Sequence, residues 1–430
     1  YRIRFKSALE ICIIISLLSP PFIGAYSWIL IGGRSGILTQ WLQNTFQYEF
    51  PSIYGFTGIL LVLTLKLYPF IYLYAAGAMK NIDSALIEAA ESLGCSGVRK
   101  VVTVIVPLIT PTILAGALMV FMNAMADFGT PMLIGEGFNV MPVMIYSEFI
   151  NEVGDQANFA AAMAAIMVVI TSTIFLLQKY VVSRKSFTMS SLRPIETKEM
   201  TGAGNIIVHA LIYLLVALSM IPQLVVVYTS FLETRGAVFT GGYSLESYTT
   251  IFSSLGTAIS NTYLYSTAAI LVIVFLGMTV AYLTTRRKSA LTDIIDTLTM
   301  FPYIIPGSVL GITLLLAFNE EPLLLSGTAL IIIISLVIRR LPYTLRSSSA
   351  ILYQISPSIE EASISLGASP LKTFFKVTAI MMLPGVMSGA ILSWITAINE
   401  LSSSVILFTG ATKTMSVAIY TEVIRASYGT

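Results

Sequence analysis

Nine long apolar segments dominate this sequence of 430 residues and decide what it can fold into. Each segment reaches the ~20 residues that an α-helix needs to cross the hydrocarbon of a bilayer. Because lipid cannot satisfy exposed backbone groups, each is predicted to be a helix. Only 11% of the residues are charged and the mean hydropathy is +0.85, so an all-α polytopic membrane protein is expected. The predicted spans are residues 9–31, 53–79, 101–126, 158–182, 206–231, 261–284, 291–317, 326–352 and 374–398.

Lysine and arginine residues are divided unequally between the two sides that these spans define. Sixteen of the 24 fall on one side, four fall within spans, and the other side has only Arg34, Arg235, Lys413 and Arg425. Cytoplasmic loops carry such an excess, so the rich side is predicted to be cytoplasmic. The predicted outer loops carry twelve acidic residues against those four bases. This balance favours a cationic cargo or a basic partner surface.

A short motif occurs twice, at Glu88–Gly94 and at Glu361–Gly367, and the two copies differ by a constant offset of 273 in the numbering. Both copies lie in predicted cytoplasmic loops between two spans. Asp83 and Ser356, which are related by the same offset, are residue types that cap helix N-termini, and Pro357 suits a first helical position. Each copy ends in a glycine, which favours the left-handed backbone that terminates a helix. Each copy is therefore predicted to be a short, solvent-exposed helix.

The repeat extends beyond the motif. Pro69 matches Pro342 at the same offset, and residues 141–148 match residues 415–422 at an offset of 274. Such self-similarity over a fixed period indicates an internal duplication. The predicted organisation is a first half at residues 1–182, a polar cytoplasmic linker at 183–205 and a second half at 206–430.

Aligning the two halves shows spans without a counterpart. The first half has no equivalent of the spans at 206–231 and 261–284, and the second half has no equivalent of the span at 158–182. We therefore expect six spans in each complete half, and a sequence that is clipped at both ends.

The duplicated motif resembles the EAA loop of permease subunits in binding-protein-dependent ABC importers. The family pattern continues to Ile-x-Leu-Pro, which the first copy approaches at Val104–Pro107, whereas the second copy has Val377–Ile380 and its next proline, Pro384, matches Pro111. The resemblance implies a coupling helix that docks in a groove of a cytoplasmic ATPase. The residues that it assigns to this contact are Glu88, Ala89, Ala90, Gly94, Glu361, Ala362, Ser363 and Gly367.

Two fused halves, with Ala-Asp-Phe-Gly-Thr-Pro at residues 126–131, resemble the permeases of ferric-iron ABC importers. This resemblance implies the MetI-like fold of type I importers, duplicated in one chain of the bacterial inner membrane. It implies two copies of an ATPase subunit that uses ATP and Mg, and a periplasmic or lipid-anchored binding protein that delivers the cargo. Relatives that carry thiamine, polyamines, aminoethylphosphonate or sugar phosphates share similar stretches and stay open as alternatives, as does an ion-coupled secondary transporter.

Several ionisable residues lie in or beside the predicted spans, where they are costly and therefore candidates for function. Acids at equivalent positions could line the passage and meet a hard cation, or they could be helix-end acids that face water or cap a loop. The bases before each motif could attract an anion, pair with these acids or extend to the headgroups. Two prolines could break or bend the helices that contain them. The candidate pathway residues are Asp127, Glu400, Lys66, Arg339, Arg340, Pro69 and Pro342.

The sequence offers no catalytic set of its own. It contains no Gly-Lys dipeptide and therefore no phosphate-binding P-loop. His209 is the single histidine, and Cys12 and Cys95 are too far apart in the predicted topology to form a metal site or a disulfide. The chain is therefore expected to be a transport subunit that binds no cofactor, holds no firm metal site and contacts lipid rather than nucleic acid.

Overall fold

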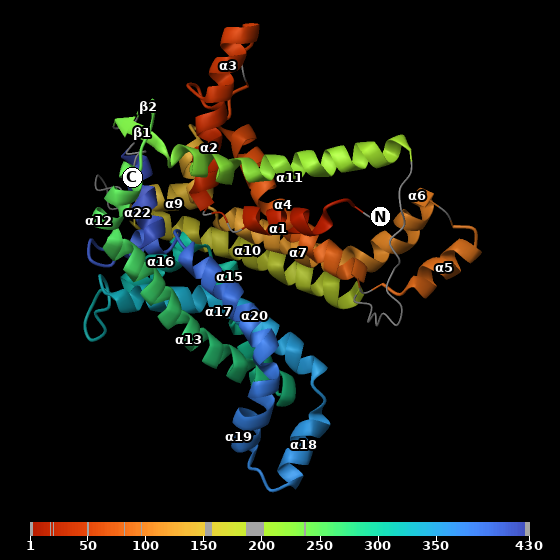
Figure 1. Cartoon of the computed structure of the whole chain (residues 1–430). Helices are drawn as coiled ribbons and strands as arrows, with labels where there is room; N and C mark the ends of the chain where they lie inside the picture. Colours follow the sequence, from red (N-terminus) through yellow and green to blue (C-terminus); the bar gives the residue numbers. More distant parts are fainter. Residues whose placement is uncertain are drawn as a thin grey trace. The chain divides into compact units, whose positions relative to one another are not determined.

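The computed structural model describes residues 3–425 except 18, 20, 50, 81, 96, 151–156, 186–201 and 236–237. Most of the predicted linker therefore lies outside the described residues. The chain divides into two compact units, Tyr1–Thr229 and Ser230–Thr430, which are considered one at a time (Figure 1). The described part is mostly helical, as the apolar segments predict.

The described part of the first unit contains eleven α-helices and one π-helix. Helix α4 packs along α7, and α11 packs against α1 and α2. The predicted boundary of the second half precedes α11, whereas the packing boundary follows it. The elements are α1 (Lys6–Leu17), α2 (Pro21–Gly32), α3 (Ile37–Phe46), α4 (Phe56–Lys80), α5 (Ser84–Ser92), α6 (Gly97–Lys100), η1 (Val101–Ile105), α7 (Val106–Ala126), α8 (Gly129–Ile134), α9 (Met141–Ile150), α10 (Ala157–Lys185) and α11 (Ala203–Thr229).

The second unit is organised around α17, which packs against both α13 and α20. A two-stranded antiparallel sheet, β1 with β2, opens the unit. The elements are β1 (Leu232–Arg235), β2 (Val238–Tyr243), α12 (Glu246–Ser254), α13 (Gly256–Arg286), α14 (Ala290–Leu298), α15 (Phe301–Ile304), α16 (Gly307–Ala317), α17 (Ala329–Gln354), α18 (Pro357–Ser365), α19 (Pro370–Thr373), η2 (Phe374–Thr378), α20 (Ala379–Ile398), α21 (Ser404–Leu407) and α22 (Met415–Ile424).

Glycines on one face of α20 allow its close approach to α17. A Cβ at Gly385 would lie 2.5 Å from Ile351 Cβ, and one at Gly389 would lie 2.7 Å from Ser347 Cβ. Small residues four apart let helix backbones approach in this way in membranes. This contact packs the first half of α20 against the C-terminal part of α17.

Six described helices are long and apolar enough to cross a membrane. They correspond to the predicted spans at 53–79, 101–126, 158–182, 206–231, 261–284 and 374–398. The predicted span 326–352 is also one helix, α17, but Arg339, Arg340 and Arg346 make it less apolar than the six.

Two predicted spans are wrong as single helices. Residues 9–31 divide between α1 and α2, and residues 291–317 divide among α14, α15 and α16. Prolines explain the divisions, because they lack an N–H and disfavour the helical conformation of the residue before them. Pro21 begins α2, and Pro306 immediately precedes α16.

Prolines inside two other long helices do not divide them. Helix α4 continues through Pro69 and α17 continues through Pro342, so neither proline breaks its helix, and bending of these helices stays a prediction. The irregularity lies elsewhere. A π-helical turn, η1 or η2, precedes α7 and α20 at equivalent positions of the two halves.

Candidate coupling helices and buried ion pairs

The two motif copies form the helices α5 and α18, which lie beyond the ends of the longer helices of their units (Figure 1). Asp83 accepts a hydrogen bond from Ala85 N at 3.0 Å, and Ser356 accepts one from Ser358 N at 3.4 Å. Pro357 is the first residue of α18. The predicted N-terminal caps are therefore confirmed.

The glycines that end the motif adopt the predicted left-handed backbone. The φ angle is +80° at Gly94 and +88° at Gly367. Glu88 and Glu361 are exposed, as are Ala89 and Ala362. Both helices thus present a carboxylate and a small side chain to the outside, as close docking of a partner requires.

Two residues of the motif face inward instead. Ala90 is buried, and Ser363 is half-buried with its Oγ 3.0 Å from Thr373 Oγ1. These two positions therefore hold the helix against its own unit, whereas the resemblance assigns them to the ATPase contact.

Large apolar side chains are exposed at matching places in the two coupling helices and in the segments that directly follow them, which sequence reasoning missed. Leu93 is 88% exposed and its counterpart Leu366 is 89% exposed. Single exposed leucines are common on protein surfaces, but a set repeated at one offset indicates a contact surface. We call these residues the apolar docking set: Leu86, Leu93 and Val98 with Ile359, Leu366 and Leu371.

The candidate pathway acids are buried and paired with the candidate bases. In the first unit Lys66 Nζ lies 2.5 Å from Asp127 Oδ2. Asp127 is 7% exposed, and its other carboxylate oxygen accepts a hydrogen bond from Thr130 N at 2.9 Å. One buried carboxylate thus joins the middle of α4 to the segment that follows α7.

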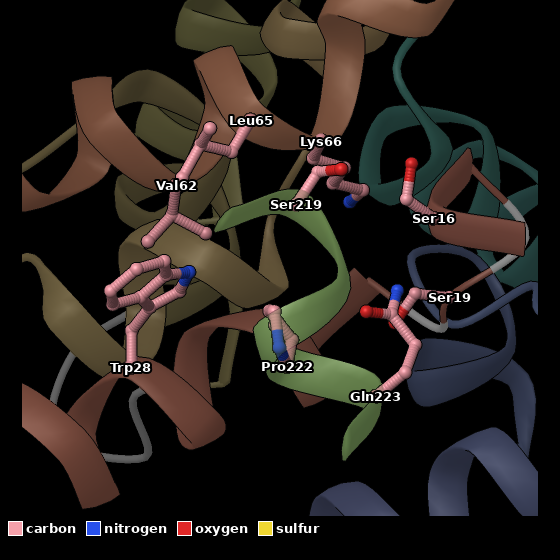
Figure 2. A pocket seen from close by; sticks show the side chains of 10 residues that line it. Ser16, Ser19, Trp28, Val62, Leu65, Lys66, Ser219, Pro222 and Gln223 are labelled. Carbon is pink, nitrogen blue, oxygen red and sulfur yellow. The ribbon is translucent and has the colours of Figure 1, made fainter. Parts of the chain in front are cut away.

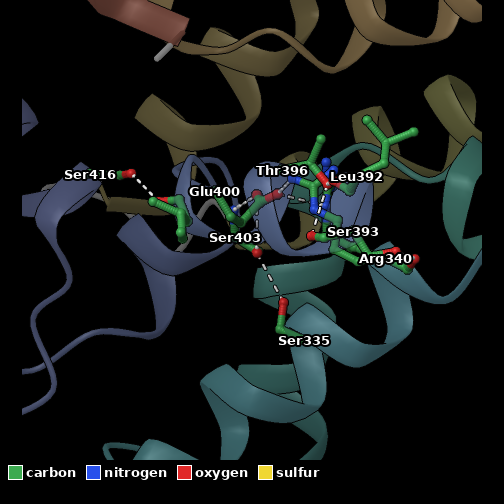
Figure 3. A network of polar contacts seen from close by, with 10 residues as sticks. Ser335, Arg340, Leu392, Ser393, Thr396, Glu400, Ser403 and Ser416 are labelled. Carbon is green, nitrogen blue, oxygen red and sulfur yellow. Dashed lines mark hydrogen bonds and ion pairs between the residues drawn. The ribbon is translucent and has the colours of Figure 1, made fainter. Parts of the chain in front are cut away.

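The second unit repeats this arrangement at the equivalent positions (Figure 3). Arg339 Nε lies 3.1 Å from Glu400 Oε2, and Arg340 Nη2 contacts the same oxygen. Glu400 is 3% exposed, and Ser403 donates to its Oε1 from the backbone N at 3.1 Å and from Oγ at 3.3 Å. Of the sequence-based alternatives, pairing of the bases with the acids and capping of a neighbouring loop are what the geometry shows.

The two buried clusters differ in charge. Lys66 and Asp127 pair one to one, whereas two arginines share the carboxylate of Glu400. Leu67, which is 4% exposed, stands at the position equivalent to Arg340. Arg339 Nη1 and Arg340 Nε are buried and have no hydrogen-bond partner in the described part of the chain. Among the described residues of the second unit, two arginines thus share one acid at this place, which leaves one positive charge uncompensated.

Hydroxyl groups extend the second cluster along α17 and α20. Ser393 Oγ donates to Arg340 O at 2.9 Å and lies 2.8 Å from Thr344 Oγ1. Ser335 Oγ donates to Ser403 Oγ at 2.9 Å (Figure 3). The cluster is thus fixed by helices on both sides, which the sequence did not indicate because serine and threonine are spread throughout the chain.

A small cavity in the first unit borders Lys66 (Figure 2). Tyr68 on α4 reaches Ser219 of α11 beside it, with 3.1 Å between the two hydroxyl oxygens. The cavity could not be found from the sequence, because α11 lies far along the chain from the other helices that form it. Its lining residues are Ser16, Ser19, Gly24, Trp28, Val62, Leu65, Lys66, Ser219, Pro222 and Gln223.

The described residues contain no group of three or more histidine, cysteine, aspartate or glutamate side chains that could hold a metal ion. Asp127 and Glu400 each already satisfy a base and a backbone N–H of their own unit. Their geometry is that of internal ion pairs that hold helices together.

Comparison with known proteins places these features in a family. Residues 1–187 and 273–429 match the family model for the inner membrane component of binding-protein-dependent transport systems. The chain belongs to this family. The match covers both halves of the predicted duplication and confirms the expected MetI-like fold, the multi-pass membrane location and the resemblance to permease subunits of such importers.

Similar curated proteins include several ferric transport permeases. The ferric transport system permease protein FbpB of Actinobacillus pleuropneumoniae is 28% identical, over all of this chain and 63% of its own length. A putative FbpB of Haemophilus influenzae is 28% identical over 93% of this chain and 64% of its own length. The putative 2-aminoethylphosphonate permease protein PhnU of Salmonella typhimurium is 29% identical over 38% of this chain. The chain thus spans less than two thirds of the length of both FbpB relatives.

Proposed function

We propose that this chain forms the membrane pathway of an ATP-driven importer that carries ferric iron into the cytoplasm. A periplasmic or lipid-anchored binding protein delivers the cargo, and two cytoplasmic ATPase subunits supply the energy. The observation that carries this proposal is the pair of capped, exposed helices α5 and α18 with their matched apolar docking set. Iron is favoured because ferric transport permeases align along most of the chain.

The coupling helices explain how a chain without a nucleotide site would be driven. In this proposal each ATPase subunit takes one coupling helix in a groove, with Leu93 or Leu366 buried at the contact. When the two ATPase subunits close on ATP, the helices move together and carry their units between two arrangements. Nucleotide and cargo then bias the same equilibrium, which is what coupling requires.

Direct contact between the transported cation and the carboxylate of Asp127 or Glu400 stays a prediction. Both carboxylates are occupied by bases, so a cation could reach them only after an ion pair opens. An ion-coupled carrier is not favoured, because the family to which the chain belongs depends on binding proteins.

The ATPase contact can be tested with the whole transport system, expressed with a tagged ATPase subunit. Leu93→Asp with Leu366→Asp should abolish co-purification of the membrane subunit, because a charge would be buried in an apolar groove. The control is Leu323→Asp, at a 59% exposed leucine of a predicted outer loop, which should leave co-purification unchanged. Retention of the ATPase by the double variant would refute the assigned surface.

The cargo can be tested by uptake of radiolabelled ferric iron into cells that carry the whole operon. Uptake should need the binding protein and ATP, and unlabelled ferric iron should compete with the label while 2-aminoethylphosphonate should not. Competition by the phosphonate alone would assign the chain to that class of importer.

A further inference from the structure

A second acid lies directly before the exposed glutamate of the second coupling helix. Glu360 is 8% exposed, whereas its neighbour Glu361 is exposed. Glu360 Oε1 lies 3.0 Å from Arg286 Nε, and its Oε2 accepts a hydrogen bond from the Tyr282 hydroxyl at 3.2 Å. Both carboxylate oxygens of Glu360 are therefore held by α13, the helix that ends at Arg286.

Arg286 joins three elements at this point. Besides its contact with Glu360, it donates from Nη2 to Ile355 O at 2.6 Å. Ile355 is the residue that follows α17 and leads into α18. A cation suits the carbonyl end of α17 and an anion suits the first turn of α18, so the helix dipoles favour this arrangement. The side chains of Arg286 and Glu360 are 13% and 10% exposed, so water screens their attraction little.

The same contact reaches the π-helical turn that follows the coupling helix. The ring of Tyr282 packs on Phe374, the first residue of η2, with 4.8 Å between ring centroids. Helix α18 is therefore tied to the end of α13 and, through Tyr282, to the π-helical turn that leads into α20.

The first unit has no such ion pair at the matching place among its described residues. The residue equivalent to Glu360 is Ile87, which packs with the buried residues Ala78, Ile82 and Ile109. Glu91 of α5 does pair with Lys100 of α6, but the Glu91 side chain is 39% exposed. The first coupling helix is thus attached by apolar contacts and the second by a buried, directional pair.

We propose that Arg286 and Glu360 form a clamp that makes α18 and α13 move as one body. Motion of the ATPase would then enter the second unit through α13, in addition to the helices adjoining α18 in the chain. The inference rests on the proposed function and assigns Arg286 and Glu360 as positioning residues of energy coupling. The clamp would serve transmission of motion, whereas the apolar docking set would serve binding of the ATPase.

The first test measures cargo transport and ATP hydrolysis together, with the complete importer in proteoliposomes. Glu360→Gln should assemble with the ATPase and hydrolyse ATP, but the amount of cargo moved per ATP should fall about tenfold or more, because a charge-assisted contact is lost. Arg286→Gln should lower the amount of cargo moved per ATP in the same way. Arg286→Lys keeps the positive charge, so it should lower this ratio less than Arg286→Gln does. The matched control is Asp296→Asn, which breaks the more exposed pair with Arg346, away from both coupling helices, and should leave the ratio unchanged.

The second test does not depend on the variants folding. Spin labels at exposed Lys288, just after α13, and at Ile364 on α18 report the distance between the two helices in the otherwise unaltered importer. That distance should be the same without nucleotide and with ATP bound. A change on ATP binding, or an unaltered cargo-to-ATP ratio in Glu360→Gln, would overturn the clamp. Absence of ATP-driven transport in the unaltered importer would instead refute the proposed function.

Discussion

The buried cluster around Glu400 yields a quantitative prediction. Glu400→Gln removes the charge that two arginines share, although the remaining amide oxygen can still accept from Ser403 N. The side chains of Glu400, Arg339 and Arg340 are only 2%, 11% and 13% exposed, so water cannot replace the lost partner. Removing one partner of a buried ion pair costs about 3–5 kcal/mol, and we expect the free energy of unfolding to fall by this amount.

A second variant tests whether stability depends on the acid or on the number of arginines that surround it. Arg340→Leu reproduces the one-to-one pairing of the first unit, where Leu67 occupies the equivalent position. Removing a buried charge is costly when it leaves the partner charge uncompensated. Here Arg339 still pairs with Glu400 and only the excess positive charge is lost, so the expected change is a loss below about 1 kcal/mol or a gain.

Both variants can be compared by titrating the detergent-solubilised protein with a denaturing detergent and following helix content by circular dichroism. The predicted order of stability places Arg340→Leu close to the unaltered protein and Glu400→Gln well below it. The reasoning is refuted if Arg340→Leu is the less stable variant, or if Glu400→Gln costs less than about 1 kcal/mol.

Two further variants test packing and capping by the same titration. Gly385→Ala should destabilise the second unit by about 1–3 kcal/mol, because the added methyl group overlaps Ile351. Its control is Gly77→Ala, where nothing lies within 4 Å of the added Cβ and helix propensity predicts a small gain in stability. Equal effects on stability at both sites would contradict the tight contact of α17 with α20. Asp83→Ala should cost about 1 kcal/mol through loss of the cap of α5, and hydrogen exchange at Ala85 N should rise, whereas unchanged protection there would show that the cap is dispensable.

Local signals in the sequence predicted the coupling helices well. Asp83, Ser356 and the two terminal glycines act within a few residues of where they stand, so their caps could be predicted from residue type alone. The duplication strengthened each prediction, since the same signal occurred twice at one offset.

Features that depend on distant parts of the chain could be predicted only in outline. The repeat showed that Lys66 matches Arg339 and that Asp127 matches Glu400, but it left pairing as one alternative among several. The Arg286–Glu360 contact was missed, because its partners stand 74 residues apart and nothing in either segment points to the other. The split spans were missed for a different reason, since hydropathy averaged over a window hides a single proline such as Pro306.

The π-helical turns η1 and η2 have a consequence for the far ends of the helices that follow them. An α-helix turns by about 100° per residue, so one residue more or fewer at this point rotates everything beyond it by that angle. Deleting one residue from η1 would turn Asp127 to another side of the span and away from Lys66, without touching either side chain. These wide turns therefore set the rotational phase of each half, and a shift in one of them would misalign an ion pair at the opposite end of the helix.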